Sequence, residues 1–247
     1  MNLSKYIIDV GFNLLVITSF MVFVVGFLYK ITIYIKTPQP LKIPQTPQSL
    51  NAIGVFFRMA ADVLFFRSLL KGAKALWVIG LIFHYFFLLI MISHLRYFIY
   101  PVPKFLVSMS GIALIDGYVL LIAALMLLLR RLGRRFINPM VNYVSIFADY
   151  FVLVLIISIA STGILMRSLS RPDIIEIKTF TLGLITLSIN SAPIYSFMFI
   201  IHITLVCLLA VYFPFSKLMH SGGYFFSPTR NMVNNPRDKR YINTWDN

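Results

Sequence analysis

Long, uninterrupted runs of apolar residues dominate the pattern along the chain. A helix needs roughly 20 apolar residues to cross about 30 Å of hydrocarbon, and five stretches are long enough. None of them alternates apolar and polar residues, as the strands of a membrane barrel do. The pattern therefore predicts an all-α integral membrane protein, a bundle of five transmembrane helices in one domain (1–247), with spans at residues 8–29, 75–97, 105–129, 142–166 and 193–216.

The two ends of this pattern need separate interpretation. The first run has no small-residue cleavage site and is followed by Lys30 and Lys36, so we interpret it as a retained helix, not a signal peptide. The last run, 179–216, contains no Lys, Arg, Asp or Glu and is too long for one simple span. Because proline suits a first helical turn, we expect Pro193 to open the fifth helix and residues 179–192 to lie on the outer membrane surface.

The composition agrees with a membrane location. The chain of 247 residues is 59% hydrophobic and 12% charged, whereas soluble domains contain about 25% charged residues. This excludes a soluble globular protein and a disordered chain. The single cysteine, Cys207, cannot form a disulfide within the chain or hold an iron–sulfur cluster. No C-x-x-C-H motif is present, which excludes covalent c-type haem.

The net charge of +14 is concentrated in three segments. Sixteen of the 22 Lys and Arg residues lie in the Pro-rich loop 30–74, in the loop after the third span and in the tail 217–247. Cytoplasmic loops carry such an excess, so we expect these segments inside the cell, the N-terminus outside and the C-terminus in the cytoplasm. The charge then indicates topology in the inner (cytoplasmic) membrane, and no nucleic-acid partner is predicted.

All four histidines of the chain belong to the second and fifth helices. They are His84 and His94 on one, and His202 and His220 at and beyond the middle of the other. Ionisable residues in membrane spans are costly and commonly functional, although any one histidine is also explained by a hydrogen bond between helices. The two helices run in opposite directions. His94 should therefore meet His202 at the outer level, and His84 should meet His220 at the inner level.

Two facing imidazoles supply both axial ligands of a haem, so the four histidines predict two non-covalent b-type haems that transfer electrons. The distance between the two histidines of one helix differs from the distance between those of the other, so the two pairs fit imperfectly. At about 1.5 Å per residue, ten residues span roughly 15 Å and eighteen residues roughly 27 Å. Pro214 lies between His202 and His220 and should kink or end the helix. The prediction requires this break to bring His220 back towards His84.

Other polar residues are weaker candidates for contacts with quinone or haem propionates. They are Arg96, Lys104, Asp116, Arg130 and Arg131. Asp116 lies near the middle of the third span, where a carboxylate is expensive; it either bonds a neighbouring helix or serves a proton path. Asp149 is expected to pair with arginines of the inner loop. We expect the quinone at the outer end, near His94, Arg96 and Lys104.

The first loop and the tail are candidate docking elements. Clustered prolines from Pro38 to Pro47 predict an extended segment. Residues 53–67 mix apolar and basic residues at helical intervals, so they either lie on the membrane surface or dock a soluble partner. The polar tail 221–247 carries the aromatic residues Phe225, Phe226 and Trp245, and we expect it to become ordered against a partner.

The histidine spacing His-x9-His and His-x17-His in a five-helix chain resembles the dihaem cytochrome b family of respiratory nitrate reductase (gamma subunit). The stretch Leu76-Trp77 through Phe83-His84 and Ser93-His94 is similar to the second helix of that family. All four ligand positions are filled. The resemblance implies that His84, His94, His202 and His220 are the axial ligands of two haem b groups.

Two further segments, Thr37–Pro44 and Phe225–Asn231, resemble DsrM, the membrane cytochrome family of sulphite-reduction-associated DsrMKJOP complexes, as does His94–Phe98 followed by Pro101-Val102-Pro103. This resemblance implies a subunit of a quinone-linked oxidoreductase complex. It would exchange electrons between menaquinone or menaquinol and a cytoplasmic iron–sulfur, heterodisulfide-reductase-like (DsrK-like) subunit in dissimilatory sulfur metabolism. The remaining implied partners are DsrJ, DsrO and DsrP.

Three alternatives stay open. In the first, the chain is the cytochrome subunit of a nitrate reductase or of a methanogen heterodisulfide reductase. In the second it is a metal transporter, since imidazole suits zinc and copper, although additional carboxylate or thiolate ligands are missing. In the third it is a haem-free anchor that tethers a soluble subunit through its loop and tail.

Overall fold

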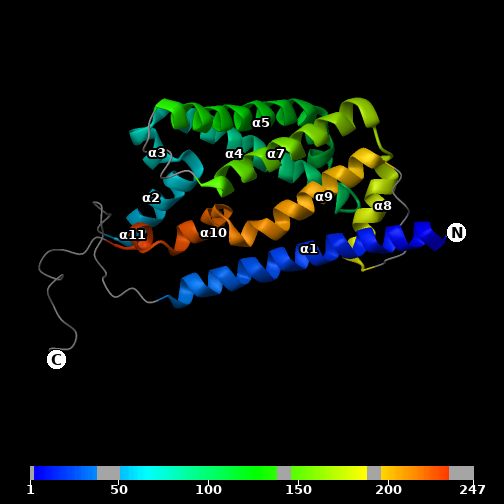
Figure 1. Cartoon of the computed structure of the whole chain (residues 1–247). Helices are drawn as coiled ribbons and strands as arrows, with labels where there is room; N and C mark the ends of the chain where they lie inside the picture. Colours follow the sequence, from blue (N-terminus) through cyan, green and yellow to red (C-terminus); the bar gives the residue numbers. More distant parts are fainter. Residues whose placement is uncertain (1–2, 38–50, 138–145, 188–195, 234–247) are drawn as a thin grey trace, which may run out of the picture. The chain divides into compact units, whose positions relative to one another are not determined.

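The computed structural model describes residues 3–37, 51–137, 146–187 and 196–233 (Figure 1). Every regular element in these ranges is helical. In chain order they are α1 (Leu3–Lys36), α2 (Ala52–Phe65), α3 (Arg67–Gly72), α4 (Lys74–His94), η1 (Leu95–Tyr97), α5 (Lys104–Ile137), α7 (Phe147–Leu165), η2 (Met166–Ser170), α8 (Ile174–Ile185), α9 (Phe197–Tyr212), η3 (Phe213–Phe215), η4 (Lys217–Met219), α10 (His220–Gly223), η5 (Tyr224–Phe226) and α11 (Pro228–Asn231).

Five helices in the described ranges are long and apolar enough to cross a membrane. They are Asp9–Lys36, Lys74–Tyr97, Lys104–Gly133, Phe147–Ser170 and Phe197–Phe215. This confirms the prediction of an all-helical protein with five candidate spans. The expected starts of the fourth and fifth spans, at 142 and 193, lie outside the described residues. The orientation, with the N-terminus outside, stays a prediction.

Several hydroxyl side chains in the spans bond within their own helices. The hydroxyl groups of Thr18, Ser158 and Thr204 donate to the carbonyl groups four residues earlier, at 2.7–2.9 Å. A backbone group without a partner is costly in lipid, which is why helices cross membranes, and Ser and Thr hydroxyls use the same carbonyls as acceptors. These residues therefore interrupt the apolar runs without breaking the helices.

The chain forms two compact units, one of residues 1–24 and 78–213 and the other of residues 25–77 and 214–247. In the first unit α5 and α7 run side by side and antiparallel (Figure 1). One end of the pair is held by an ion pair between Arg131 and Asp149 at 2.7 Å. At the other end, Arg167 donates to the carbonyl of Ser110 at 2.8 Å. The expected pairing of Asp149 with an inner-loop arginine is thereby confirmed.

Residues 179–185 belong to the helix α8. One face of α8 is exposed, but Ile177 and Phe180 are buried against Phe199 of α9. The ring of Phe12 also stacks on Phe180, with centroids 5.7 Å apart. Apolar side chains three residues apart thus form one inward face, and the position of this stretch on the outer membrane surface stays a prediction. Residues 188–192 lie outside the described ranges.

The second unit contains α2, α3, the tail helices and residues 25–36 of α1. The Asn51 side chain caps α2 by accepting from the Gly54 N–H at 2.7 Å, and Trp77 Nε1 donates to the carbonyl of Phe65 at its end (2.7 Å). As predicted, the fifth span breaks at Pro214: α9 ends at Tyr212 and the short turns η3 and η4 follow. The Pro-rich segment 38–47 lies outside the described residues.

The tail is helical in its first half. Residues 220–231 form short helices, and α11 packs on α2 of the same chain. Polar groups of α2 thus contact this part of the tail within the chain, and the ordering of residues 221–247 against a partner stays a prediction. Trp245 lies outside the described residues.

Candidate functional site

His94 and His202 both lie in the first unit. His94 is the last residue of α4, and His202 lies in α9 with 8% of its surface exposed. His94 Nδ1 lies 2.7 Å from the carbonyl oxygen of Ile90, and His202 Nδ1 lies 2.9 Å from Oγ1 of Thr162 in α7. The pairing of His94 with His202 at the outer level stays a prediction.

These hydrogen bonds determine which ring nitrogen carries the proton. A carbonyl only accepts, so His94 Nδ1 must be the donor. The Thr162 hydroxyl lies 2.9 Å from the carbonyl oxygens of Ser158 and Ile159, so it can donate to one of these and accept from His202 Nδ1. In a neutral ring whose Nδ1 donates, the lone pair is on Nε2, which is the arrangement of a histidine oriented for metal ligation.

The other two histidines show the same pattern in separate units. His84 Nδ1 lies 2.7 Å from the carbonyl oxygen of Gly80 in the first unit. His220 Nδ1 lies 2.8 Å from the carbonyl oxygen of Lys217 in the second unit. The side chains of His84 and His220 are both exposed. All four histidines therefore have Nδ1 within hydrogen-bond distance of a nearby oxygen.

The residues around His94 and His202 fit a haem between two imidazoles. A haem with an imidazole on each face keeps the two ligand helices apart, and α4 and α9 are not closely packed on each other in the described ranges. Among the described residues, no three or more His, Cys, Asp or Glu side chains gather as a metal site. A haem takes only two axial ligands from the protein.

The weaker candidates occupy different environments. Arg96 donates to the hydroxyl of Tyr97 at 3.1 Å, and the Tyr97 ring lies 5.9 Å from the His94 ring. Lys104 is the exposed first residue of α5. Asp116 lies within α5 and is 3% exposed, and its Oδ2 has no hydrogen-bond partner in the described part of the chain.

The two arginines at the far end of α5 were candidates for propionate contacts. Arg131 has its guanidinium on Asp149, which gives it a structural partner within the chain. Arg130 precedes it in the same helix. Contact of either arginine with a propionate of the inner haem stays a prediction.

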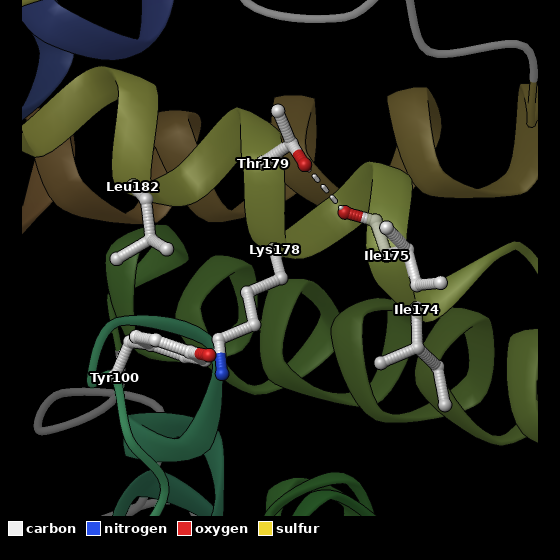
Figure 2. A pocket seen from close by; sticks show the side chains of 6 residues that line it. All are labelled: Tyr100, Ile174, Ile175, Lys178, Thr179 and Leu182. Carbon is white, nitrogen blue, oxygen red and sulfur yellow. Dashed lines mark hydrogen bonds between the residues drawn. The ribbon is translucent and has the colours of Figure 1, made fainter.

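A shallow pocket lies beside α8 in the first unit (Figure 2). Its lining residues are Tyr100, Ile174, Ile175, Lys178, Thr179 and Leu182. The Lys178 ammonium group lies 4.8 Å from the ring centre of Tyr100. The helix is tied to the residues after His94, because Thr181 Oγ1 donates to the carbonyl of Tyr97 at 2.6 Å. The pocket is therefore mostly apolar, with one cation at its edge.

The sequence pattern alone did not identify Thr162 or Asp62 as functional residues. Thr162 is 40 residues from His202 in the chain, and it resembles the other hydroxyl residues that interrupt the spans. Asp62 of α2 accepts a hydrogen bond from Tyr224, 162 residues away. One signal was available: Asp62 is the single acidic residue in a basic, apolar segment.

Comparison with known proteins places this architecture in a family. Residues 47–237 match the nitrate reductase gamma subunit family. The "Hdr-like menaquinol oxidoreductase cytochrome b-like subunit" of Archaeoglobus fulgidus is 35% identical over 91% of this chain and 80% of its own length. The protein of the same name from Archaeoglobus profundus is 31% identical, over 92% of this chain and 80% of its own. With five candidate spans and this match over most of its length, the chain belongs to the nitrate reductase gamma subunit family.

Proposed function

We propose that the chain is the membrane cytochrome b subunit of a menaquinol-linked oxidoreductase complex. His94 and His202 are the axial ligands of an outer haem b, and His84 and His220 are those of an inner haem b. A six-coordinate haem supplies one-electron transfer without exchanging a ligand. The proposal follows the family and the relatives, whose names include menaquinol oxidoreductase.

One observation carries the proposal: all four histidines direct Nδ1 to a nearby oxygen. A histidine that only joins two helices has no need of a fixed tautomer with its lone pair on Nε2. A histidine that binds iron does need one, because the ring must be neutral and correctly turned. The same arrangement at four positions is the expected basis of two bis-histidine sites.

We propose that quinol is oxidised at the outer end of the bundle. Arg96 and Lys104 lie on either side of the segment that carries Tyr100, and the pocket beside α8 opens there. An apolar pocket with a few polar groups is typical of a small-molecule site. Asp116 is the candidate proton carrier, because it is a buried carboxyl group within a span and its Oδ2 has no hydrogen-bond partner in the described residues.

The proposed electron partner is an iron–sulfur, heterodisulfide-reductase-like subunit of the DsrK type on the cytoplasmic side of the inner membrane. The tail motif Phe225–Asn231 and the loop motif Thr37–Pro44 support a place in dissimilatory sulfur metabolism, with DsrJ, DsrO and DsrP as further subunits. Purification in a gentle detergent tests this assignment. Co-purification of a nitrate reductase catalytic subunit would contradict it.

The first experiment is a reduced-minus-oxidised visible spectrum of the purified chain, with the extracted haem counted per chain. Two non-covalent b haems per chain are expected. One haem would overturn one of the two histidine pairs. No haem in folded protein that was expressed with an adequate haem supply would overturn the proposal and favour an anchor or a transporter.

Thr162→Val is expected to weaken the outer haem selectively. The valine has nearly the same shape but cannot accept from His202 Nδ1, so the imidazole loses the bond that orients it. Loss of such a supporting bond costs roughly 10–100-fold in metal affinity. Haem titration of the haem-free protein measures the change. Thr162→Ser retains the hydroxyl group and is the matched control; equal affinity of both variants would contradict the role of Thr162.

A further inference from the structure

Asp62, near the end of α2, is the centre of a hydrogen-bond cluster in the second unit. Its side chain is 9% exposed. Its Oδ1 accepts from the backbone N–H of Ser68 at 3.0 Å and from the Ser68 hydroxyl at 2.8 Å. Its Oδ2 accepts from the Tyr224 hydroxyl at 3.2 Å and lies 3.6 Å from an Arg230 nitrogen. One carboxylate therefore joins α2 to two places in the tail.

The tail residues of this cluster also contact one another and α2. The Arg230 guanidinium lies 5.0 Å from the ring centre of Tyr224. Arg58, one turn before Asp62 on α2, donates to the carbonyl of Arg230. Burial, together with the negative charge of Asp62, raises the pKa of Tyr224. The Tyr224 hydroxyl therefore keeps its proton and remains a donor to Asp62.

The turn that carries His220 is joined directly to this cluster. His220 begins α10, and Tyr224 follows one helical turn later at the start of η5. On the other side, α10 lies tightly on α1. A Cβ atom at Gly222 would lie 2.7 Å from Cδ1 of Ile31 and 3.2 Å from Cζ of Phe27. The His220 turn is thus held between α1 and the Asp62 cluster.

We propose that Asp62 is a positioning residue for His220, acting through Tyr224 and Arg230. The inference rests on the proposed function, in which His220 ligates the inner haem. A ligand on a four-residue turn after a proline break has little helix of its own to hold it. Hydrogen bonds to a charged group are stronger than those between neutral groups. The Asp62 carboxylate accepts three hydrogen bonds, one of them from Tyr224, and forms an ion pair with Arg230, so it attaches this turn to α2.

The experiment uses the full chain and compares Asp62→Asn, Asp62→Ala and the control Asp149→Asn. Asp62→Asn keeps an oxygen for Ser68 but loses the charge, and Asp62→Ala loses both. Asp149→Asn removes a comparable buried carboxylate that pairs with Arg131 in the first unit. The readouts are haem per chain, the midpoint potential of each haem and the low-spin electron paramagnetic resonance signals.

Asp62→Ala is expected to reduce the affinity for the inner haem by about tenfold or more and to shift its resonance signal, with a smaller effect for Asp62→Asn. The outer haem should be unchanged in both and therefore reports that the chain is folded. Asp149→Asn should leave the inner haem signal unaltered. Unchanged affinity, potential and signal of the inner haem in Asp62→Ala would overturn the proposal.

A second variant tests the same proposal if Asp62→Ala does not yield folded protein. Tyr224→Phe removes only the hydroxyl group that links Asp62 to the His220 turn, and it should shift the inner haem signal in the same direction. No effect of Tyr224→Phe or Asp62→Asn would also overturn the proposal. Absence of haem from the unaltered chain would instead refute the proposed function, so the two failures are distinguishable.

Discussion

Replacing His94 or His202 by alanine is expected to remove one haem and to leave the other. In the proposed function, His94 and His202 are axial ligands of the same iron, so each variant would lose one ligand of that haem. The haem content should fall from two to about one per chain, since a haem is held by its axial ligands. Extraction of haem and a redox titration of the purified variants measure this loss.

The prediction also requires that His94→Ala and His202→Ala have the same visible spectrum. If His94 pairs with His202, the haem that remains has the same spectrum and midpoint potential in both variants. A spectrum of His202→Ala that matches His84→Ala instead would show that the pairing is wrong. Thr204→Ala is the matched control on α9, because the Thr204 hydroxyl only donates to the carbonyl of Ile200 and both haems should remain.

Replacing His84 or His220 by alanine is expected to remove the other haem and to uncouple quinol oxidation from the partner. The remaining outer haem should still be reduced by a menaquinol analogue. Electrons should then fail to reach an acceptor on the opposite side, because the inner haem is the proposed second step. Stopped-flow reduction of haem and steady-state transfer to the purified partner complex separate the two processes.

This second pair also tests the orientation in the membrane. With the N-terminus outside, the haem that survives in the His84 and His220 variants is the one reached by quinol at the outer end. Loss of quinol reduction in these variants, with transfer to the partner retained, would show that the topology is inverted. A cysteine-labelling assay from each side of sealed vesicles provides an independent control for orientation.

The spans were predictable from the sequence because apolar runs of helical length have few alternatives in a membrane. The break at Pro214 was predictable for a similar local reason, since proline cannot continue an α-helix. The burial of α8 was missed. Its apolar side chains are compatible both with a lipid surface and with the rings of Phe12 and Phe199, and only packing distinguishes the two.

The contacts of the tail could not be predicted from the sequence for the same reason. A polar, proline-containing segment with aromatic residues suggests order induced by a partner. In the structure, Tyr224 and Arg230 of the tail contact Asp62 of α2 in the same chain. Complementary charges and donors 160 or more residues apart leave no periodic pattern in the chain, so no window of sequence reveals them.

The sequence by itself determined the helical class, the five candidate spans, the break in the fifth and the helices that carry His84, His94 and His202. His220 was expected on the fifth helix, but it begins α10 after the break. These properties depend on hydropathy and on local backbone restrictions, which each segment carries alone. Only the tertiary structure decided three contacts. Thr162 is hydrogen-bonded to His202, α8 packs against α9 in the core of the first unit, and Asp62 of α2 binds the tail. Each of these needs two distant side chains to meet, and that meeting depends on how the helices pack.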